Sequence, residues 1–539
     1  MKNGKNQSHQ IDPIDIKIHG ARTPDGSRWI KVTFQEHTSR WLPFASFRKN
    51  GSTAESVLAE QGLVFMKSQF SCLMQKVEDL AEFSDQEVAS RIGWSGPNFA
   101  FPSGTLITSR GASTGDIAFS PISNRDGTSG SAKAWRKHVA RPLAGQPLAS
   151  FAMMIPFAAP LLRIVDHPTN FGFEFAGSGG IGKSTICKLA MSAIGPMENM
   201  TISMNATANA IDQLMSEFND QVMMLEEWNI MALQGGANAG REAARLAFVM
   251  GDGTSKRRFD ASTHGRVRFL WLTSTNRPLP LMLEGIDPET AKAALDRTLT
   301  IAIPGEREHG IFDRPNERYS SVAEMAEGVA QAAGEYHGTA FRKYLAKLIL
   351  KRRKDPEALR SRLMATQRQF VAKIVEAGDA STHRRVIEAF GLVYAAGRVA
   401  KHFKVLPAEF DCMGAVEQAY GLHVASRSAV ATPVERLQSL LSSPTLLDVR
   451  EAGEAEETDI LSASGVLFRH YGRGDELLLT REQLQALTPN PSAFLKNPAI
   501  RACMALEDKR LQVYRYSLPK SGRRRFFCFS LDALEDQGY

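Results

Sequence analysis

The sequence of 539 residues has few cysteines and no long uninterrupted apolar run. Its five cysteines form no CxxC pair, which argues against a zinc site and against a disulfide framework. The first ten residues are polar and lack the apolar core of a signal peptide. The longest apolar stretch, at residues 151–165, is broken by two prolines and an arginine and is too short to span a membrane. We therefore expect a cytoplasmic protein without a membrane partner.

The composition is that of an ordinary soluble globular protein, with 43% hydrophobic and 23% charged residues. The length predicts three to five units if each holds ~100–200 residues. The formal net charge is +7, and nucleic acid is the first partner to consider because Lys and Arg neutralise phosphates. A mildly basic protein with no polyanionic partner explains the charge equally well.

Hydrophobic patterns divide the chain into four regions. Residues 1–145 predict an α+β domain that begins with a β-hairpin around Pro24-Asp25-Gly26. Residues 146–315 alternate strands and helices, which predicts a parallel α/β sheet covered on both faces. Residues 316–430 predict a helical region, and residues 431–539 a winged-helix domain. An acidic stretch at 451–459 is typical of a linker.

A glycine-rich loop follows the strand expected at 171–176. Its residues fit the pattern G-x-x-x-x-G-K-[ST] and are Gly177, Ser178, Gly179, Gly180, Ile181, Gly182, Lys183 and Ser184, with Thr185 next along the helix. Glycines let successive backbone N–H groups point at phosphates, and the helix directs its positive end at the same anion. Lys183 is expected to reach the β- and γ-phosphates of ATP, and Ser184 to bind Mg²⁺. The alternative is a chance glycine-rich turn.

Two acids end the hydrophobic strand expected at 222–225. One carboxylate, Glu226, is expected to organise Mg²⁺, and the other, Glu227, to orient and deprotonate the attacking water. The usual first acid of such a Walker B pair is Asp, so the division of roles between these two residues stays open. An acidic pair on the surface at a strand end is the alternative.

Asn276 follows the buried strand expected at 269–274. Strand carboxyl ends line the ligand crevice in parallel sheets, so this side chain is expected to contact the γ-phosphate or the water. Asn before Arg-Pro is also an ordinary turn.

With these elements in order, the sequence resembles the AAA+ superfamily of P-loop ATPases. Further segments resemble a family of P-loop ATPases carried by mobile genetic elements and prophages, and they are residues 90–94, 135–136, 205–210 and 250–258. Some members of that family look like MCM-type self-loading replicative helicases, which form hexameric rings on DNA. The resemblance covers roughly residues 30–420. The resemblance to the AAA+ superfamily, rather than to that family, implies that Asn276 acts as sensor 1. In ring ATPases an arginine at the position of Arg297 projects into the neighbouring subunit's site, unless Arg297 is held in a surface ion pair with Asp296.

Two basic segments are expected to contact DNA. The first, Lys256-Arg257-Arg258, matches a pore hairpin in MCM-like helicases, where cations would track the phosphates of one strand. The second is the tip of the expected wing, with Lys520, Arg523, Arg524 and Arg525. For the first segment the alternatives are that its arginines face the neighbouring subunit's ATP or that it is an exposed basic loop without a ligand. For the second the alternative is a wing that binds protein.

The leading hypothesis is an ATP-dependent DNA helicase or translocase that forms a ring, expected to be a hexamer, in replication of a mobile genetic element or prophage. The alternative is a nucleotide-gated switch, such as an origin initiator or a defence sensor, that binds DNA without unwinding it. A metabolic kinase with the same loop fits poorly, because such kinases are small and seldom carry a carboxy-terminal wing.

Overall fold

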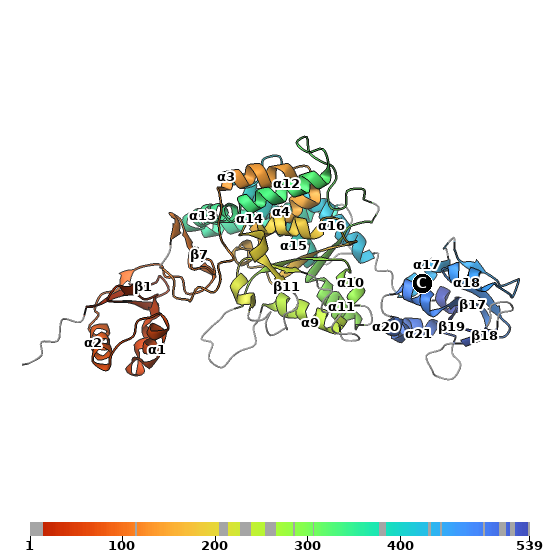
Figure 1. The fold of residues 1–539 in the computed structure, drawn as a ribbon, viewed down its shortest axis with the longest axis horizontal. Helices are drawn as coiled ribbons and strands as arrows, with labels where there is room; N and C mark the ends of the chain where they lie inside the picture. The colour runs from red at the N-terminus through yellow and green to blue at the C-terminus, as the bar shows by residue number, and fades with distance from the viewer. Residues whose placement is uncertain are drawn as a thin grey trace, which may run out of the picture.

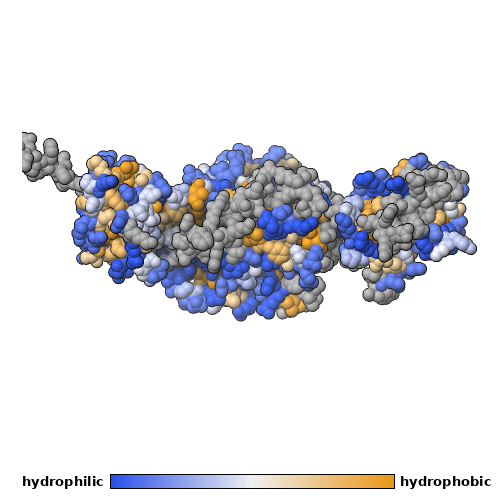
Figure 2. All heavy atoms as spheres, turned by 90° about the horizontal axis from the view of Figure 1, so that it is seen from below, coloured by the Kyte–Doolittle hydropathy of each residue, from blue (hydrophilic) through white to orange (hydrophobic). Residues whose placement is uncertain are grey.

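A computed structural model of the chain describes residues 15–113, 116–203, 214–226, 239–253, 266–283, 286–305, 307–376, 384–428, 433–441, 443, 445–488, 491–505, 514–517 and 523–536. They form an amino-terminal unit, a central body and a carboxy-terminal unit that lie in a row (Figure 1). In the view of Figure 2, the described surface is mainly hydrophilic, with hydrophobic residues in small groups. Within these ranges, no helix is both long and apolar enough to cross a bilayer.

The amino-terminal unit is a five-stranded sheet covered by two helices. The predicted hairpin is confirmed, because the first two strands pair antiparallel and Thr23 Oγ1 donates to Asp25 Oδ1 at 2.6 Å within its turn. The elements are β1 (Ile16–Arg22), β2 (Arg28–Phe34), β3 (His37–Thr38), β4 (Leu42–Pro43), α1 (Ser52–Glu60), α2 (Lys67–Glu78) and β5 (Ser84–Asp85). Their apolar side chains, such as Leu58 and Leu73, make a separate core.

A small antiparallel sheet and a short helical segment connect this unit to the central body. The elements are β6 (Gly93–Ser95), β7 (Asn98–Ala100), β8 (Leu106–Thr108), β9 (Gly111–Ser113), α3 (Ala132–Trp135), η3 (Arg136–Ala140) and η4 (Arg141–Leu143). Trp94 and Trp135 are fully buried in the core of the central body. This connecting segment is therefore packed as part of that body.

The central body is built on a parallel sheet, as the sequence predicts, and the sheet has five strands, of which β11 was not expected. Its strands are β10 (Phe171–Ala176), β11 (Thr201–Ser203), β12 (Val222–Glu226), β13 (Leu270–Thr275) and β14 (Thr298–Ala302). Their order is β11-β12-β13-β10-β14, and every neighbouring pair is parallel. Gly172 faces Trp271 across the central pair of strands, where a side chain on residue 172 would collide with the indole. Because all the strands run the same way, their carboxyl ends meet at one edge of the sheet.

Helices cover both faces of this sheet. They are α4 (Pro147–Ala158), α5 (Leu161–Ile164), α6 (Lys183–Met191), α9 (Ala239–Asp252), α10 (Leu279–Met282) and α11 (Pro288–Leu295). The helical region predicted after residue 316 is present as α12 (Val322–Glu335), α13 (Thr339–Lys354), α14 (Pro356–Glu376), α15 (Arg384–His402) and α16 (Cys412–Ser428). In Figure 1, α9, α10 and α11 lie on the side of the sheet away from α12 and α13.

One hydrophobic core runs through the central body from Trp94 to Tyr420. Helix α15 packs on α4, and α16 packs on β14. His423 Nδ1 and Ser426 Oγ both lie 2.9 Å from the carbonyl oxygen of Thr300. The expected divisions after residues 145 and 315 fall inside this shared core, because helices on both sides of each division bury their apolar faces together.

The carboxy-terminal unit contains a five-stranded sheet and short helices. The elements are α17 (Pro433–Leu441), β15 (Leu447–Asp448), α18 (Glu457–Ser462), β16 (Val466–His470), β17 (Gly474–Leu479), α19 (Arg481–Leu487), α20 (Pro491–Lys496), α21 (Pro498–Cys503), β18 (Tyr514–Ser517), β19 (Arg523–Ser530) and α22 (Leu531–Asp536). The strand order is β15-β16-β17-β19-β18. The predicted hairpin of the last two strands is present, but it forms the edge of this larger sheet.

The acidic stretch at 451–459 is not a linker, so this prediction is wrong. Val449 and Ala455 are buried beside Ile460 in a core that includes strands β16, β17 and β19. The charges of the stretch face solvent while these apolar residues fix it to the sheet.

Candidate functional site

The glycine-rich loop leaves the carboxyl end of β10 and enters α6. Gly180 and Gly182 have φ angles of 79° and 88°, in the region that strongly favours glycine. A Cβ on residue 182 would also lie 3.0 Å from Ile311 Cγ2 and 3.1 Å from Phe312 Cε2. The open side of the loop faces a cavity, since a Cβ on Gly179 would meet nothing within 4 Å. The loop therefore has the shape of a backbone cradle in front of a helix amino terminus, which suits phosphate groups.

Lys183 lies at the centre of this cradle. Its side chain folds back so that Nζ donates to the Gly177 carbonyl at 2.9 Å, to the Ser178 carbonyl and to Asn276 Oδ1 at 3.1 Å. The residue is only 5% exposed, and burial lowers the pKa of its ammonium group. All three acceptors are neutral, so the positive charge is held in place without a counter-ion from these partners. An anion that enters the loop can replace these acceptors as the partner of the Lys183 ammonium group.

A hydroxyl pair lies beside the lysine. Ser184 Oγ is 2.9 Å from Ser274 Oγ, and Ser274 is the register partner of Glu226 on the next strand. Glu226 is 39% exposed at its side chain and forms an ion pair with Lys188 at 3.4 Å. Hydroxyl and carboxylate oxygens are ligands that Mg²⁺ accepts alongside phosphate oxygens and water. The oxygens present therefore fit the metal that the sequence predicts, and Ser274 is a member that sequence reasoning missed.

The cavity in front of the loop has a volume of about 680 Å³. Residues 179–185 and Ser274–Asn276 form part of its lining, and the rest comes from residues 307–310, Phe312 and α12. Its size lies in the range of small-molecule sites, and Phe312, Val322 and Ala326 give it an apolar wall. Sequence reasoning missed this second part of the lining. The charged run after β14, with Arg307 and His309, was the available signal.

A buried acid supports the sheet beneath the site. Glu174 lies in the middle of β10, fully buried, and accepts from the Leu279 N–H at 3.0 Å and from Thr300 Oγ1 at 2.5 Å. Burial raises its pKa to about 7, against the two hydrogen bonds, which lower it. Glu174 thus connects three segments, namely β10, β14 and the helix that follows Asn276. A lone acid in the run FGFEFA was the signal in the sequence.

Arg297 lies at the opposite edge of the sheet. It directly precedes β14, whose first residue, Thr298, is the register partner of Gly172 on β10. Arg297 is therefore level with residue 171, six residues before Gly177. At about 3.3 Å per residue of strand, roughly 20 Å separate Arg297 from the start of the loop. Its guanidinium donates to the Ala293 carbonyl at 2.9 Å and lies 4.7 Å from the centre of the Phe248 ring. Its ion-pair partner is Asp252 at 3.3 Å rather than the neighbouring Asp296 considered from the sequence.

The Gly93-Trp94 segment is a structural anchor. Asp220 Oδ2 accepts from the Trp94 N–H at 2.9 Å, and a Cβ on Gly93 would lie 2.5 Å from the same oxygen. Asp220 also pairs with Arg163 at 3.0 Å, while burial raises the pKa of its carboxyl group. Trp94 Nε1 donates to the Pro160 carbonyl at 2.9 Å. These contacts fix the connecting sheet to the end of the parallel sheet where β12 begins.

Several predicted residues lie outside the described ranges. They are Glu227, Lys256, Arg257, Arg258 and Lys520. Arg523, Arg524 and Arg525 belong to β19, where they pair with Ser517, Tyr516 and Arg515, and Arg525 is exposed.

Comparisons with known proteins give a likeness in fold over nearly the whole chain and a match to a family model over just under half of it. A family model described as "Domain of unknown function (DUF927)" matches residues 2–269. No curated protein matches the chain. A solved structure titled "SCCmec type IV Cch - active helicase" superposes with a TM-score of 0.55 at 13% sequence identity, covering 97% of this chain and 95% of that chain. The chain therefore shares its fold with that structure over nearly its whole length.

Proposed function

We propose that the chain is an ATP-dependent DNA helicase or translocase whose ATP site is the loop from Gly177 to Ser184. The observation that carries the proposal is the position of Lys183, whose buried ammonium group is held at the centre of the loop by neutral acceptors only. An exposed lysine on a chance turn would have no reason to be preorganised in this way. The adjoining cavity of about 680 Å³ has room for the rest of a nucleotide.

Each residue of the site has a proposed role. The loop N–H groups and Lys183 bind the β- and γ-phosphates, and the lysine ammonium stabilises the charge that develops on the transferred group. Asn276 lies 3.1 Å from Lys183 Nζ and orients the attacking water. Glu227 accepts the proton from that water. The apolar wall with Phe312 holds the base.

Ser184, Ser274 and Glu226 form the proposed metal-binding side. Mg²⁺ held there would neutralise charge on the phosphate oxygens. Glu226 must first leave Lys188, an exposed ion pair of the kind that contributes little to stability. The register pairing of Glu226 with Ser274 keeps the carboxylate next to the hydroxyl pair.

Arg297 is proposed to act in a neighbouring subunit. At roughly 20 Å along the strands from its own loop, it cannot reach that loop, so a catalytic role requires assembly into a ring, for which we propose a hexamer. Its contacts with Phe248, Asp252 and Ala293 would have to be released. These contacts within one subunit are the observation that favours the alternative, a DNA-bound switch in which the arginine stays in place.

DNA is the proposed substrate. The fold likeness to a structure whose title reads active helicase, from a mobile element, supports this choice. The proposed contacts are Lys256, Arg257 and Arg258 in the central body and Lys520, Arg523, Arg524 and Arg525 near the carboxy terminus. A role in replication of a mobile genetic element or prophage is part of the same proposal.

A comparison of ATP hydrolysis by the wild type and Lys183→Ala, with and without single-stranded DNA, tests the proposal. We expect DNA to stimulate the wild type and the variant to lose on the order of 100-fold or more in turnover. Lys292→Ala, a change at an exposed residue of α11, is the matched control and keeps full activity. Asn276→Ala provides a second test that leaves the loop intact, with slower turnover but retained ATP binding. Wild-type rates in both Lys183→Ala and Asn276→Ala would overturn the site.

A further inference from the structure

A second cavity, which we call the basic pocket, lies on the central body and shares no lining residue with the proposed ATP site. It has a volume of about 400 Å³. Its lining residues are Lys133, Arg136, Lys137, Arg141, Lys401, Lys404, Leu406, Pro407, Ala408 and Glu409. Six of these ten carry a positive charge and one a negative charge. The pocket therefore holds a net charge of about +5, a large share of the net +7 of the whole chain.

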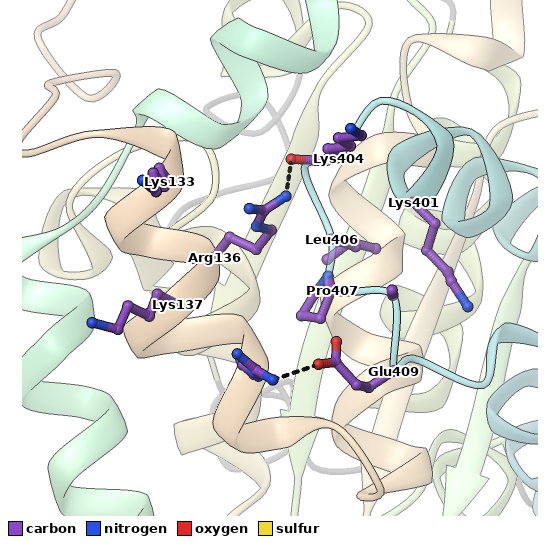
Figure 3. A pocket seen from close by; sticks show the side chains of 10 residues that line it. Lys133, Arg136, Lys137, Lys401, Lys404, Leu406, Pro407 and Glu409 are labelled. Atoms are coloured by element: carbon purple, nitrogen blue, oxygen red, sulfur yellow. Dashed lines mark hydrogen bonds and ion pairs between the residues drawn. The ribbon is translucent and has the colours of Figure 1, made fainter.

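Two segments far apart in sequence form the basic pocket (Figure 3). One is the helical segment α3–η3–η4, which carries Lys133 and Arg136. The other runs from the last turn of α15, which carries Lys401, into the connection to α16, which carries Lys404. Arg136 joins them by donating to the Lys404 carbonyl at 2.9 Å. The Lys404 backbone has a φ angle of 55°, a left-handed conformation uncommon outside glycine. The cations are thus brought together by the tertiary fold.

The charges of the basic pocket are mostly not neutralised by the protein. Arg141 pairs with Glu409 at 2.8 Å, and this is the one ion pair among the lining residues. Lys401 donates to the Phe410 carbonyl, which is neutral. No acid in the described ranges forms an ion pair with Lys133 or Lys404. Like charges held this close repel one another, so an anion in the pocket would relieve the repulsion.

Helix α13 extends the positive charge. Its sixteen residues include no acid. Lys343 Nζ donates to the Lys404 carbonyl at 3.0 Å, and Lys347 Nζ donates to the Phe403 carbonyl at 2.8 Å. The pKa of Lys343 is lowered, first by burial and then by the charges of Lys347, Arg136 and Lys404. The backbone carbonyls of Phe403 and Lys404 therefore accept hydrogen bonds from lysines of α13, in addition to the one from Arg136.

We propose that the basic pocket binds phosphate groups of the DNA backbone, as a contact site separate from Lys256–Arg258 and from the β18–β19 hairpin. The inference rests on the proposed function, because it takes DNA to be the polyanion that the basic pocket binds. The lining carries no aromatic side chain and only three apolar residues, so it offers no surface for stacking a base. A free nucleotide would need such an apolar slot. Contacts of this kind are independent of sequence and position the strand.

The salt dependence of DNA binding tests the proposal. The double variant Lys133→Gln/Lys404→Gln removes one exposed cation from each side of the basic pocket. Its matched control, Lys67→Gln/Lys292→Gln, removes two exposed lysines from α2 and α11. Fluorescence anisotropy measures binding of a labelled single-stranded oligonucleotide to the full chain over a range of salt. The loss of two phosphate contacts should reduce the steepness of log K, where K is the association constant, against log salt by ~1.4. Binding should weaken about 60-fold at ~50 mM salt and about tenfold at ~200 mM salt.

Each outcome decides the question. Equal slopes in the pocket variant and in the control overturn the basic pocket while leaving the proposed function standing. A wild type that does not bind DNA at all overturns both. If calorimetry shows that the pocket variant loses binding of inorganic tripolyphosphate but keeps DNA binding, the pocket serves free phosphates and the proposal fails. Lys133→Arg/Lys404→Arg should keep wild-type DNA binding, which separates loss of charge from loss of folding.

Discussion

Replacement of Glu174 by Gln should make the stability of the central body less dependent on pH. The pKa of Glu174 is raised from an ordinary value of 4.5 to about 7. Between these values the unfolded chain releases the proton while the folded chain keeps it. Stability therefore falls as pH rises from 4.5 to about 7, and it stays low above that range.

The size of the effect follows from the two pKa values. Between pH ~5 and pH ~8, one carboxyl group with these values changes the free energy of unfolding by ~2.5 kcal/mol. Glu174→Gln resembles the protonated acid in shape. Its Oε1 can still accept from the Leu279 N–H, and its amide can donate to Thr300 Oγ1, as the protonated carboxyl group would. The variant should thus match the wild type near pH ~5 and exceed it by about 2.5 kcal/mol near pH ~8.

Urea unfolding followed by tryptophan fluorescence measures this difference. Trp271, packed on Gly172 beside β10, reports on the same sheet. Glu60→Gln, an exposed change on α1, is the control and should shift the transition midpoint equally at both pH values. A constant difference between Glu174→Gln and the wild type across the pH range would refute the argument that Glu174 holds its proton in the folded state.

Three further predictions concern the site and its support. Gly182→Ala should abolish ATP binding in equilibrium dialysis while the far-ultraviolet circular dichroism spectrum stays unchanged. The reason is that residue 182 has a φ angle of 88° and a new Cβ there would press on Ile311. Retained affinity for ATP would contradict the cradle. Ser274→Ala should raise the Mg²⁺ concentration needed for half-maximal ATP hydrolysis, and an unchanged requirement would remove Ser274 from the metal-binding side. Asp220→Ala should lower the free energy of unfolding by ~3–5 kcal/mol, since it leaves Arg163 without its partner, and a loss below ~1 kcal/mol would show that Gly93-Trp94 does not depend on this anchor.

Four of the five strands of the parallel sheet were predictable because they are short buried runs bounded by turns and helices. Residues 171–176 are apolar apart from one acid, and the glycine-rich loop that follows fixes where the strand ends. The hairpin at Pro24-Asp25-Gly26 was predictable for a similar local reason. Each of these features lies within a few residues, where patterns in sequence report on conformation.

Long-range contacts were not predictable in the same way. Ser184 and Ser274 are 90 residues apart, and only the pairing of β13 with β10 brings them to 2.9 Å. The partner of Arg297 is Asp252 and not the adjacent Asp296, because α9 packs beside α11 and supplies the carboxylate. The same limitation explains the divisions expected after residues 145 and 315, where helices of different regions share one core. The acidic stretch looked like a linker because its one buried apolar residue, Ala455, does not alter its average composition, and the other residues that fix it, Val449 and Ile460, flank it.

Strand displacement on a forked DNA duplex tests the central claim most directly. Wild-type protein, Lys183→Ala and the control Lys292→Ala should be compared with ATP on forks of both polarities. We expect displacement by the wild type and the control, and none by Lys183→Ala. DNA-stimulated hydrolysis by the wild type without displacement on any fork would contradict a helicase, and displacement by Lys183→Ala at the wild-type rate would contradict the assigned ATP site.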